Sequence, residues 1–231
     1  MTKELLIFGA NGALGKGITK VLLKKDFDQV YLFASKFDKN DLPNAQKILI
    51  KDLSVEANVI DAFKSIKSGK DKMLFLYSTI GGYFGGKTIW ETEDAEWENI
   101  LKINLKTSFL IAKYFAKFVA ESYGGGICFT AAETGIHAES NKAAYGVSKS
   151  ALIHLVKTLA LEGVKIKLSV NAIAPYIIDT PSNREWMKDD DYSGWIKPEE
   201  IGELAFSLFN NFNFITGNIL ELKNRFEVRT K

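Results

Sequence analysis

The sequence predicts an α/β fold: a single doubly wound domain whose parallel sheet of about seven strands is flanked by helices. Short apolar runs alternate with longer amphipathic stretches along all 231 residues. The runs are apolar at successive positions, which is typical of strands that helices cover on both faces. No internal repeat, low-complexity tract or linker divides the chain, so we expect one domain over residues 1–231.

The first half of the chain shows this alternation clearly. Residues 5–8 are four consecutive apolar side chains and predict a strand, and the apolar positions of 16–25 recur at helical spacing. The same two patterns then repeat. They predict strands at 30–34, 47–50 and 73–77, and helices at 55–66, 95–101 and 107–120.

The second half continues the pattern up to the last strand. We expect strands at 127–130, 167–173 and 218–222, and helices at 143–161 and 198–209. Between the last two strands, the polar segment 181–197 carries Trp186 and Trp195. Loops at strand ends often carry function, so this segment is predicted to be a substrate loop.

Composition excludes several classes of function. Thirty Lys and Arg against 28 Asp and Glu give a net charge of +2, without the basicity of a nucleic-acid-binding protein. One cysteine, Cys128, and two histidines predict neither an internal disulfide nor a metal site. Apolar runs fall far short of the ~20 residues that span a bilayer, and no signal-peptide pattern follows the N-terminus. We therefore expect a cytoplasmic protein that binds no membrane.

A glycine-rich turn follows the first predicted strand and precedes the first helix. Its three glycines let the backbone turn tightly and approach a pyrophosphate at the amide-rich start of that helix. This context favours a Rossmann-type dinucleotide site over a plain tight turn. The predicted contacts are Gly9, Asn11, Gly12, Ala13, Leu14 and Gly15.

The end of the second strand is where the adenosine ribose of a dinucleotide lies. An acid there would hold the 2′-hydroxyl of NAD, but this chain has Ala34, Ser35 and Lys36, with Asp38 further out. A hydroxyl and a cation suit a 2′-phosphate. Ser35 and Lys36 therefore favour NADP(H), with NAD(H) possible; the alternative is that Lys36 is only a loop charge.

Tyr145 and Lys149 are four residues apart in the helix predicted at 143–161. Side chains at this spacing share one face of a helix. A nearby ammonium lowers the pKa of a tyrosine, which prepares the phenol to exchange a proton near neutrality. We therefore predict that the pair is catalytic.

With these motifs in place, the chain resembles the short-chain dehydrogenase/reductase family over its whole length. The resemblance implies an NAD(P)-dependent oxidoreductase in which Tyr145 supplies a proton, Lys149 also binds the nicotinamide ribose and Asn104 holds a relay water. It also implies cofactor contacts at both ends of the dinucleotide. The matching positions are Asp52, Leu53, Ile80, Gly81, Pro175, Ile178 and Thr180.

Two positions depart from the usual family pattern. Ala13 replaces a glycine of the turn, and Ala132 stands where the family has its catalytic serine. Loss of a donor that polarises a substrate carbonyl ordinarily costs about 10²-fold or more in rate. Thr130 or Thr134 could replace the serine, or Glu133 could orient a polar substrate instead.

Both departures occur in the dihydropteridine reductase-like branch, which the chain also resembles in residues 81–86 and 179–184. That resemblance implies a quinonoid dihydropterin as substrate, an electron-poor ring that accepts hydride without a serine-polarised carbonyl. The branch has an Asp at the end of the second strand and prefers NADH, so Ser35 and Lys36 differ from it. The alternatives are a ketone or 3-oxoacyl thioester reductase, and an NADP-binding sensor or scaffold with weakened catalysis.

The remaining predictions concern the substrate and the assembly. Ala132, Glu133, Tyr83 and Trp186 are predicted to contact a small-molecule substrate, with Trp90 as a further candidate for an aromatic wall. In the family, the helices that correspond to 107–120 and 143–161 pair across a two-fold axis. The resemblance therefore implies a homodimer or a homotetramer.

Overall fold

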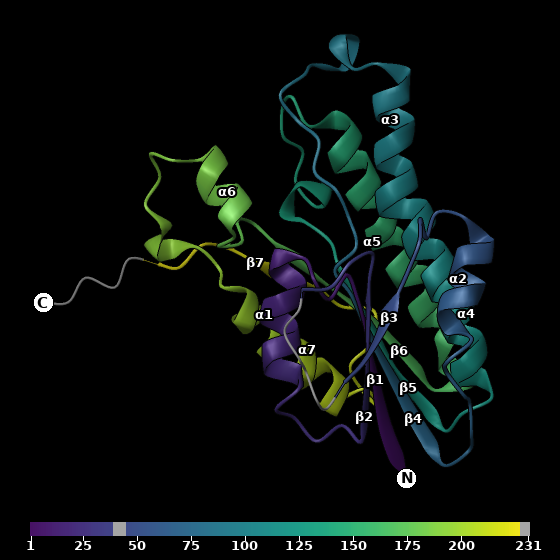
Figure 1. Ribbon diagram of the computed structural model, residues 1–231. Coiled ribbons are helices and arrows are strands. Elements are labelled where there is room, and N and C mark those ends of the chain that lie inside the picture. The colour runs from purple at the N-terminus through teal and green to yellow at the C-terminus, as the bar shows by residue number, and fades with distance from the viewer. Residues whose placement is uncertain (39–44, 227–231) are drawn as a thin grey trace, which may run out of the picture.

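A seven-stranded parallel sheet forms the centre of the protein (Figure 1). The computed structural model describes residues 1–38 and 45–226. The strands run in the order β3-β2-β1-β4-β5-β6-β7, so the order reverses between β1 and β4 and the predicted doubly wound α/β fold is confirmed. The strands are β1 Thr2–Phe8, β2 Gln29–Ala34, β3 Gln46–Leu49, β4 Lys72–Ser78, β5 Gly124–Thr130, β6 Leu168–Pro175 and β7 Ile219–Leu222.

Helices cover both faces of the sheet because successive strand residues point to opposite sides. Leu5 and Ile7 of β1 pack under α1 Ala13–Leu22 and α7 Pro198–Asn210. The alternate residues, Leu6 and Phe8, belong to a second apolar cluster on the opposite face. The helices of that face are α2 Glu56–Phe63, α4 Thr107–Ala120 and α5 Ala143–Gly163.

Two helices extend beyond the carboxyl ends of the strands, on opposite sides of the sheet (Figure 1). α3 spans Asp94–Leu101, and the π-helical turn Lys102–Lys106 joins it to α4 without a break. α6, Pro181–Trp186, lies inside the segment predicted to be a loop. Pro181 at its first position and the Thr180 hydroxyl, which accepts a hydrogen bond from the Asn183 amide, begin this short helix.

Two aromatic side chains lie elsewhere than predicted. Trp195, expected on a substrate loop, is 2% exposed and packs against Tyr192 with ring centroids 4.7 Å apart. Trp90, expected in an aromatic wall, is 85% exposed. Among the described residues, no helix is long and apolar enough to cross a membrane.

Candidate active site

The glycine turn lies at the carboxyl end of β1 and begins α1. Gly9 has φ +81°, a conformation that favours glycine. At Gly15, an added Cβ would lie 2.1 Å from the Gly9 carbonyl oxygen, so α1 starts directly against the turn. The N-cap residue of α1 is Gly12, which has no side chain to accept a hydrogen bond from the first amides of the helix. The amide groups of the first helical turn are therefore available to an anion.

A cavity of about 450 Å³ opens beside this turn, at the carboxyl ends of β1, β2 and β4. The structure brings nine of the predicted cofactor residues into its lining. They are Gly9, Asn11, Gly12, Ser35, Lys36, Asp52, Leu53, Ile80 and Gly81. Their binding role stays a prediction, but their convergence on one cavity is what a dinucleotide site requires.

Two carboxylates near this cavity are held in place. Asp52 accepts hydrogen bonds from the Ser54 hydroxyl at 2.6 Å and the Ser54 amide at 2.9 Å, which lower the pKa of Asp52 to about 2. Asp38 forms an ion pair with Lys16 at 2.6 Å and a hydrogen bond with Asn11, and both lower the pKa of Asp38. Asp38, which lies beyond the predicted ribose site in the sequence, therefore contacts Asn11 of the glycine turn.

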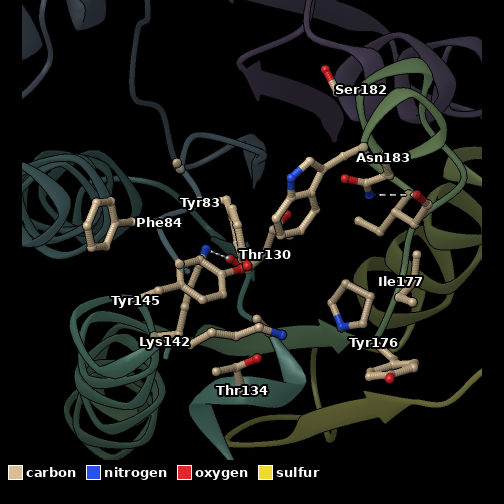
Figure 2. A pocket seen from close by; sticks show the side chains of 18 of the residues that line it. Tyr83, Phe84, Thr130, Thr134, Lys142, Tyr145, Tyr176, Ile177, Ser182 and Asn183 are labelled. Atoms are coloured by element: carbon tan, nitrogen blue, oxygen red, sulfur yellow. Dashed lines mark hydrogen bonds between the residues drawn. The ribbon is translucent and has the colours of Figure 1, made fainter. Parts of the chain in front are cut away.

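Figure 2 shows a second, larger cavity of about 870 Å³. It adjoins the first, because Thr79 and Gly81 line both. Tyr145, Lys149, Pro175 and Ile178 line this cavity, as do most of the predicted substrate residues. Of the other predicted cofactor residues, Ala13, Leu14 and Gly15 form the start of α1. Thr180 caps α6.

Tyr145 and Lys149 share one face of α5, but their electrostatics differ from the prediction. Lys149 is 4% exposed and donates a hydrogen bond to the Thr130 carbonyl at 2.8 Å, with its ammonium 5.9 Å from the Tyr145 ring centre. Burial lowers the pKa of Lys149 to about 8. Burial also raises the pKa of Tyr145, and Tyr83 and Glu139 reinforce this. The predicted lowering of the tyrosine pKa by Lys149 is therefore wrong for this structure, because desolvation dominates.

The burial of Lys149 predicts how stability depends on pH. The unfolded chain keeps this proton up to pH 10.5, whereas the folded chain releases it near pH 8. The unfolded state therefore binds more protons between these values. The free energy of unfolding should gain about 1–2 kcal/mol from Lys149 between about pH 8 and pH 9.5.

Urea unfolding of the wild type and of Lys149→Met at both pH values measures this contribution. The other titrating groups are common to both proteins, so they cancel in the comparison. The stability difference between the two proteins should change with pH by about 1–2 kcal/mol. A difference that is independent of pH would show that Lys149 is not desolvated as the structure indicates.

Asn104 occupies the π-helical turn, fully buried. Its side-chain amide donates to the Gly82 carbonyl at 3.0 Å and to the Ser148 hydroxyl at 2.9 Å, and its side-chain oxygen accepts from the Gly82 amide at 2.7 Å. Both amide hydrogens thus have protein partners. The side chain fixes the loop after β4 against α5, and its role with a relay water stays a prediction.

Three of the four predicted substrate residues line the larger cavity. Ala132 lies buried in its wall, and Tyr83 packs edge-on against both Tyr145 and Trp186, with ring centroids 5.1 Å apart in each case. The fourth prediction, Glu133, is wrong. In the described structure it lies outside the cavity and forms an ion pair with Lys223.

The physical reason is the direction of the turn after β5. The short helical turn Glu133–Gly135 directs Glu133 toward β7, where the Lys223 ammonium sits between Glu133 and Glu221. His137 hydrogen-bonds Glu221 at 2.8 Å in the same group. Glu133, His137 and Glu221 lie close enough together to offer three metal ligands. Lys223 forms ion pairs with both carboxylates of this group, and no metal site was predicted.

Neither threonine proposed to replace the missing serine has a free hydroxyl. The Thr130 hydroxyl donates to the Ser78 carbonyl at 3.1 Å, and the Thr134 hydroxyl donates to Glu139. Sequence reasoning missed two charged residues of this wall, Glu139 and Lys142. The available signal was the polar run 139–142, immediately before the catalytic helix.

Comparisons with known proteins agree with this geometry. The sequence profile of a family described as short chain dehydrogenase matches residues 3–191. Dihydropteridine reductase of Dictyostelium discoideum is 28% identical over 235 residues, covering 100% of this chain and 98% of that protein. Carbonyl reductase family member 4 of Xenopus laevis is 26% identical over 230 residues, covering 95% and 96%.

Solved structures share the fold. A structure described as ElxO with NADP bound has a TM-score of 0.82 at 22% identity, covering 96% of this chain and 97% of that one. The family profile spans most of the chain, including the glycine turn and the Tyr145–Lys149 pair. The chain therefore belongs to the short chain dehydrogenase family, as an oxidoreductase that works with a nicotinamide cofactor.

Proposed function

We propose that this protein reduces a quinonoid dihydropterin with NADPH. One observation carries the proposal: Ala132 and Tyr145, the proposed proton donor, line the same cavity, and neither nearby threonine has a free hydroxyl. Such a site suits an electron-poor conjugated ring, which needs no polarised carbonyl. The rings of Tyr83 and Trp186 offer contact area to a flat substrate. The similarity to dihydropteridine reductase over the whole chain supports the same substrate class.

The smaller cavity fits the nucleotide part of the cofactor. The Gly9 turn and the start of α1 would hold the pyrophosphate, with Ser35 and Lys36 toward the adenosine ribose. Asp52 and Leu53 would lie beside the adenine, and Pro175 and Ile178 beside the nicotinamide. Lys36 lines the smaller cavity beside Ser35, where its ammonium would meet a 2′-phosphate.

When bound, the reduced cofactor supplies a hydride to the substrate ring. Tyr145 donates the proton that completes the reduction, so the dihydropterin gains one hydride and one proton and becomes a tetrahydropterin. Lys149 holds the nicotinamide ribose and provides positive charge beside the phenol. Asn104 fixes the Gly82 loop between the two cavities.

Oxidation of NADPH, followed by its absorbance, tests this function. The purified protein should reduce quinonoid dihydropterin. It should reduce simple ketones and a 3-oxoacyl thioester about 10²-fold more slowly. Ala132→Ser should raise the ketone rate, because it restores the polarising hydroxyl. Faster reduction of ketones than of dihydropterin would favour a carbonyl reductase, a class to which the Xenopus relative belongs by name. Cofactor binding without any turnover would favour a sensor.

Lys36 gives a prediction for cofactor preference. Lys36→Ala should raise the KM for NADPH about tenfold, the expected loss for one charge-assisted hydrogen bond to a phosphate. The KM for NADH should stay unchanged, since that cofactor lacks the phosphate, and it serves as the internal control. Equal KM values for both cofactors, unaltered in the variant, would contradict the preference for NADPH.

We further propose that the protein is a homodimer or homotetramer that pairs through α4 and α5. Phe109 of α4 and Val147 of α5 are 48% and 45% exposed, which leaves apolar surface on both helices. Light scattering after gel filtration measures the assembly, and a monomer would contradict it. The cytoplasmic location stays a prediction.

A further inference from the structure

A pair of opposite charges lies in the wall of the larger cavity. Glu139 and Lys142 precede α5, and the Lys142 ammonium donates to a Glu139 oxygen at 2.5 Å. The other Glu139 oxygen accepts a hydrogen bond from the Thr134 hydroxyl. The side chains are 32% and 27% exposed, and Lys142 extends below the Tyr145 ring toward the middle of the cavity (Figure 2).

Both members of the pair stay ionised. Burial acts to raise the pKa of Glu139, but the hydrogen bonds from Lys142 and Thr134 outweigh it and the pKa is lowered. Burial acts to lower the pKa of Lys142, but Glu139 outweighs it and the pKa is raised. The cavity therefore presents a fixed negative acceptor next to a fixed positive donor.

The pair keeps unused hydrogen-bonding capacity. A carboxylate has about four lone-pair positions, of which Lys142 and Thr134 use one each. An ammonium has three hydrogens, of which Glu139 uses one. A ligand edge that carries two N–H donors beside a carbonyl oxygen would complement what remains. The 2-amino-4-oxopyrimidine edge of a pterin has this order of groups.

We propose that Glu139 accepts hydrogen bonds from the 2-amino group and ring N–H of the substrate, while Lys142 donates to its 4-oxo group. The proposal rests on the proposed function and names the residues that select the pterin. Glu139 lies close enough to Tyr145 and Tyr83 to affect the pKa of both phenols. An edge held there places the rest of the substrate beside the proton donor.

A matched control pair exists in the same segment. Glu133 and Lys223 form an ion pair of the same kind, but Glu133 is directed toward β7 and away from the cavity. Glu133→Gln therefore removes the same charge, six residues earlier in the chain, without touching the cavity. It should leave both substrate binding and turnover at the wild-type level.

Binding of two non-reducible probes tests the recognition without relying on turnover. Pterin carries the 2-amino group, whereas lumazine has an oxygen in its place. In titrations followed by tryptophan fluorescence, the wild type should bind pterin at least about tenfold more tightly than lumazine, because the lumazine oxygen faces the Glu139 carboxylate and only the ring N–H remains as a donor. Glu139→Gln should abolish this discrimination, and Lys142→Met should weaken both probes, since both carry the 4-oxo group.

Kinetics provide the second measurement. Glu139→Gln should raise the KM for quinonoid dihydropterin about tenfold with kcat nearly unchanged, since its carboxylate binds the substrate but transfers no proton to it. Unchanged NADPH binding checks that the variant is folded. A wild type that reduces dihydropterin yet binds both probes equally would overturn this inference alone. A wild type that reduces ketones but neither reduces dihydropterin nor binds pterin would overturn the proposed function as well.

Discussion

Tyr145→Phe is expected to lower kcat for reduction by about 10²–10⁴-fold, the usual contribution of a positioned proton donor. The phenol lines the larger cavity, on the same helical face as Lys149. Burial raises the pKa of Tyr145, so the hydroxyl stays protonated at neutral pH and is available as an acid. Stopped-flow or steady-state oxidation of NADPH measures the loss.

Tyr83→Phe is the matched control for this variant. It removes a neighbouring hydroxyl but keeps the ring that packs against Tyr145 and Trp186. Its kcat should stay close to the wild-type value, and both variants should bind NADPH normally. If Tyr145→Phe kept its activity while Tyr83→Phe lost it, the proton would come from Tyr83.

Gly15→Ala is expected to damage both stability and cofactor binding. Its Cβ would lie 2.1 Å from the Gly9 carbonyl oxygen and 2.9 Å from backbone atoms of Ala10, which cannot move aside as a flexible side chain would. Overpacking of this kind costs about 1–3 kcal/mol of the free energy of unfolding. The displaced start of α1 should also weaken NADPH binding by more than about tenfold, because those amides are the proposed pyrophosphate site.

Gly12→Ala provides the comparison within the same turn. An added Cβ there meets only the Gly9 oxygen, at the ordinary contact distance of 3.4 Å, and Gly12 has an extended backbone with φ −68°. Denaturant unfolding and cofactor titration should show a much smaller effect than for Gly15. Equal effects of the two substitutions would show that the close packing of α1 on the turn is not what the cofactor requires.

The sequence predicted those features that depend on local pattern. Strands buried on both faces, the spacing of the glycines and the Tyr145–Lys149 interval are all visible along the chain, and each one fixes a fold element or a helix face. The direction in which a turn points its side chains cannot be predicted in this way. Glu133 and Glu139 both follow Ala132 within seven residues, and the helical turn Glu133–Gly135 directs Glu133 toward β7 while Glu139 lines the cavity.

The pKa of Tyr145 was mispredicted for a related reason. Spacing shows that Lys149 is near, but it does not show that Lys149 is buried or that the Tyr145 phenol is desolvated. Desolvation depends on the whole surrounding fold, and here it outweighs the charge of one neighbour. Trp195 was mispredicted for the same reason. It lies in a polar stretch of the sequence, but the tertiary structure buries its side chain.

The hydrogen bonds of Asn104 have a mechanical consequence. Its side chain pairs with both the amide and the carbonyl of Gly82, as a neighbouring strand would, and joins them through Ser148 to α5. The backbone between the two cavities is thus braced to the helix that carries Tyr145 and Lys149. We therefore expect Tyr145 and this backbone to move together, and we expect differences in ligand preference to come from the outer walls, such as the six-residue α6 and the turn before α5.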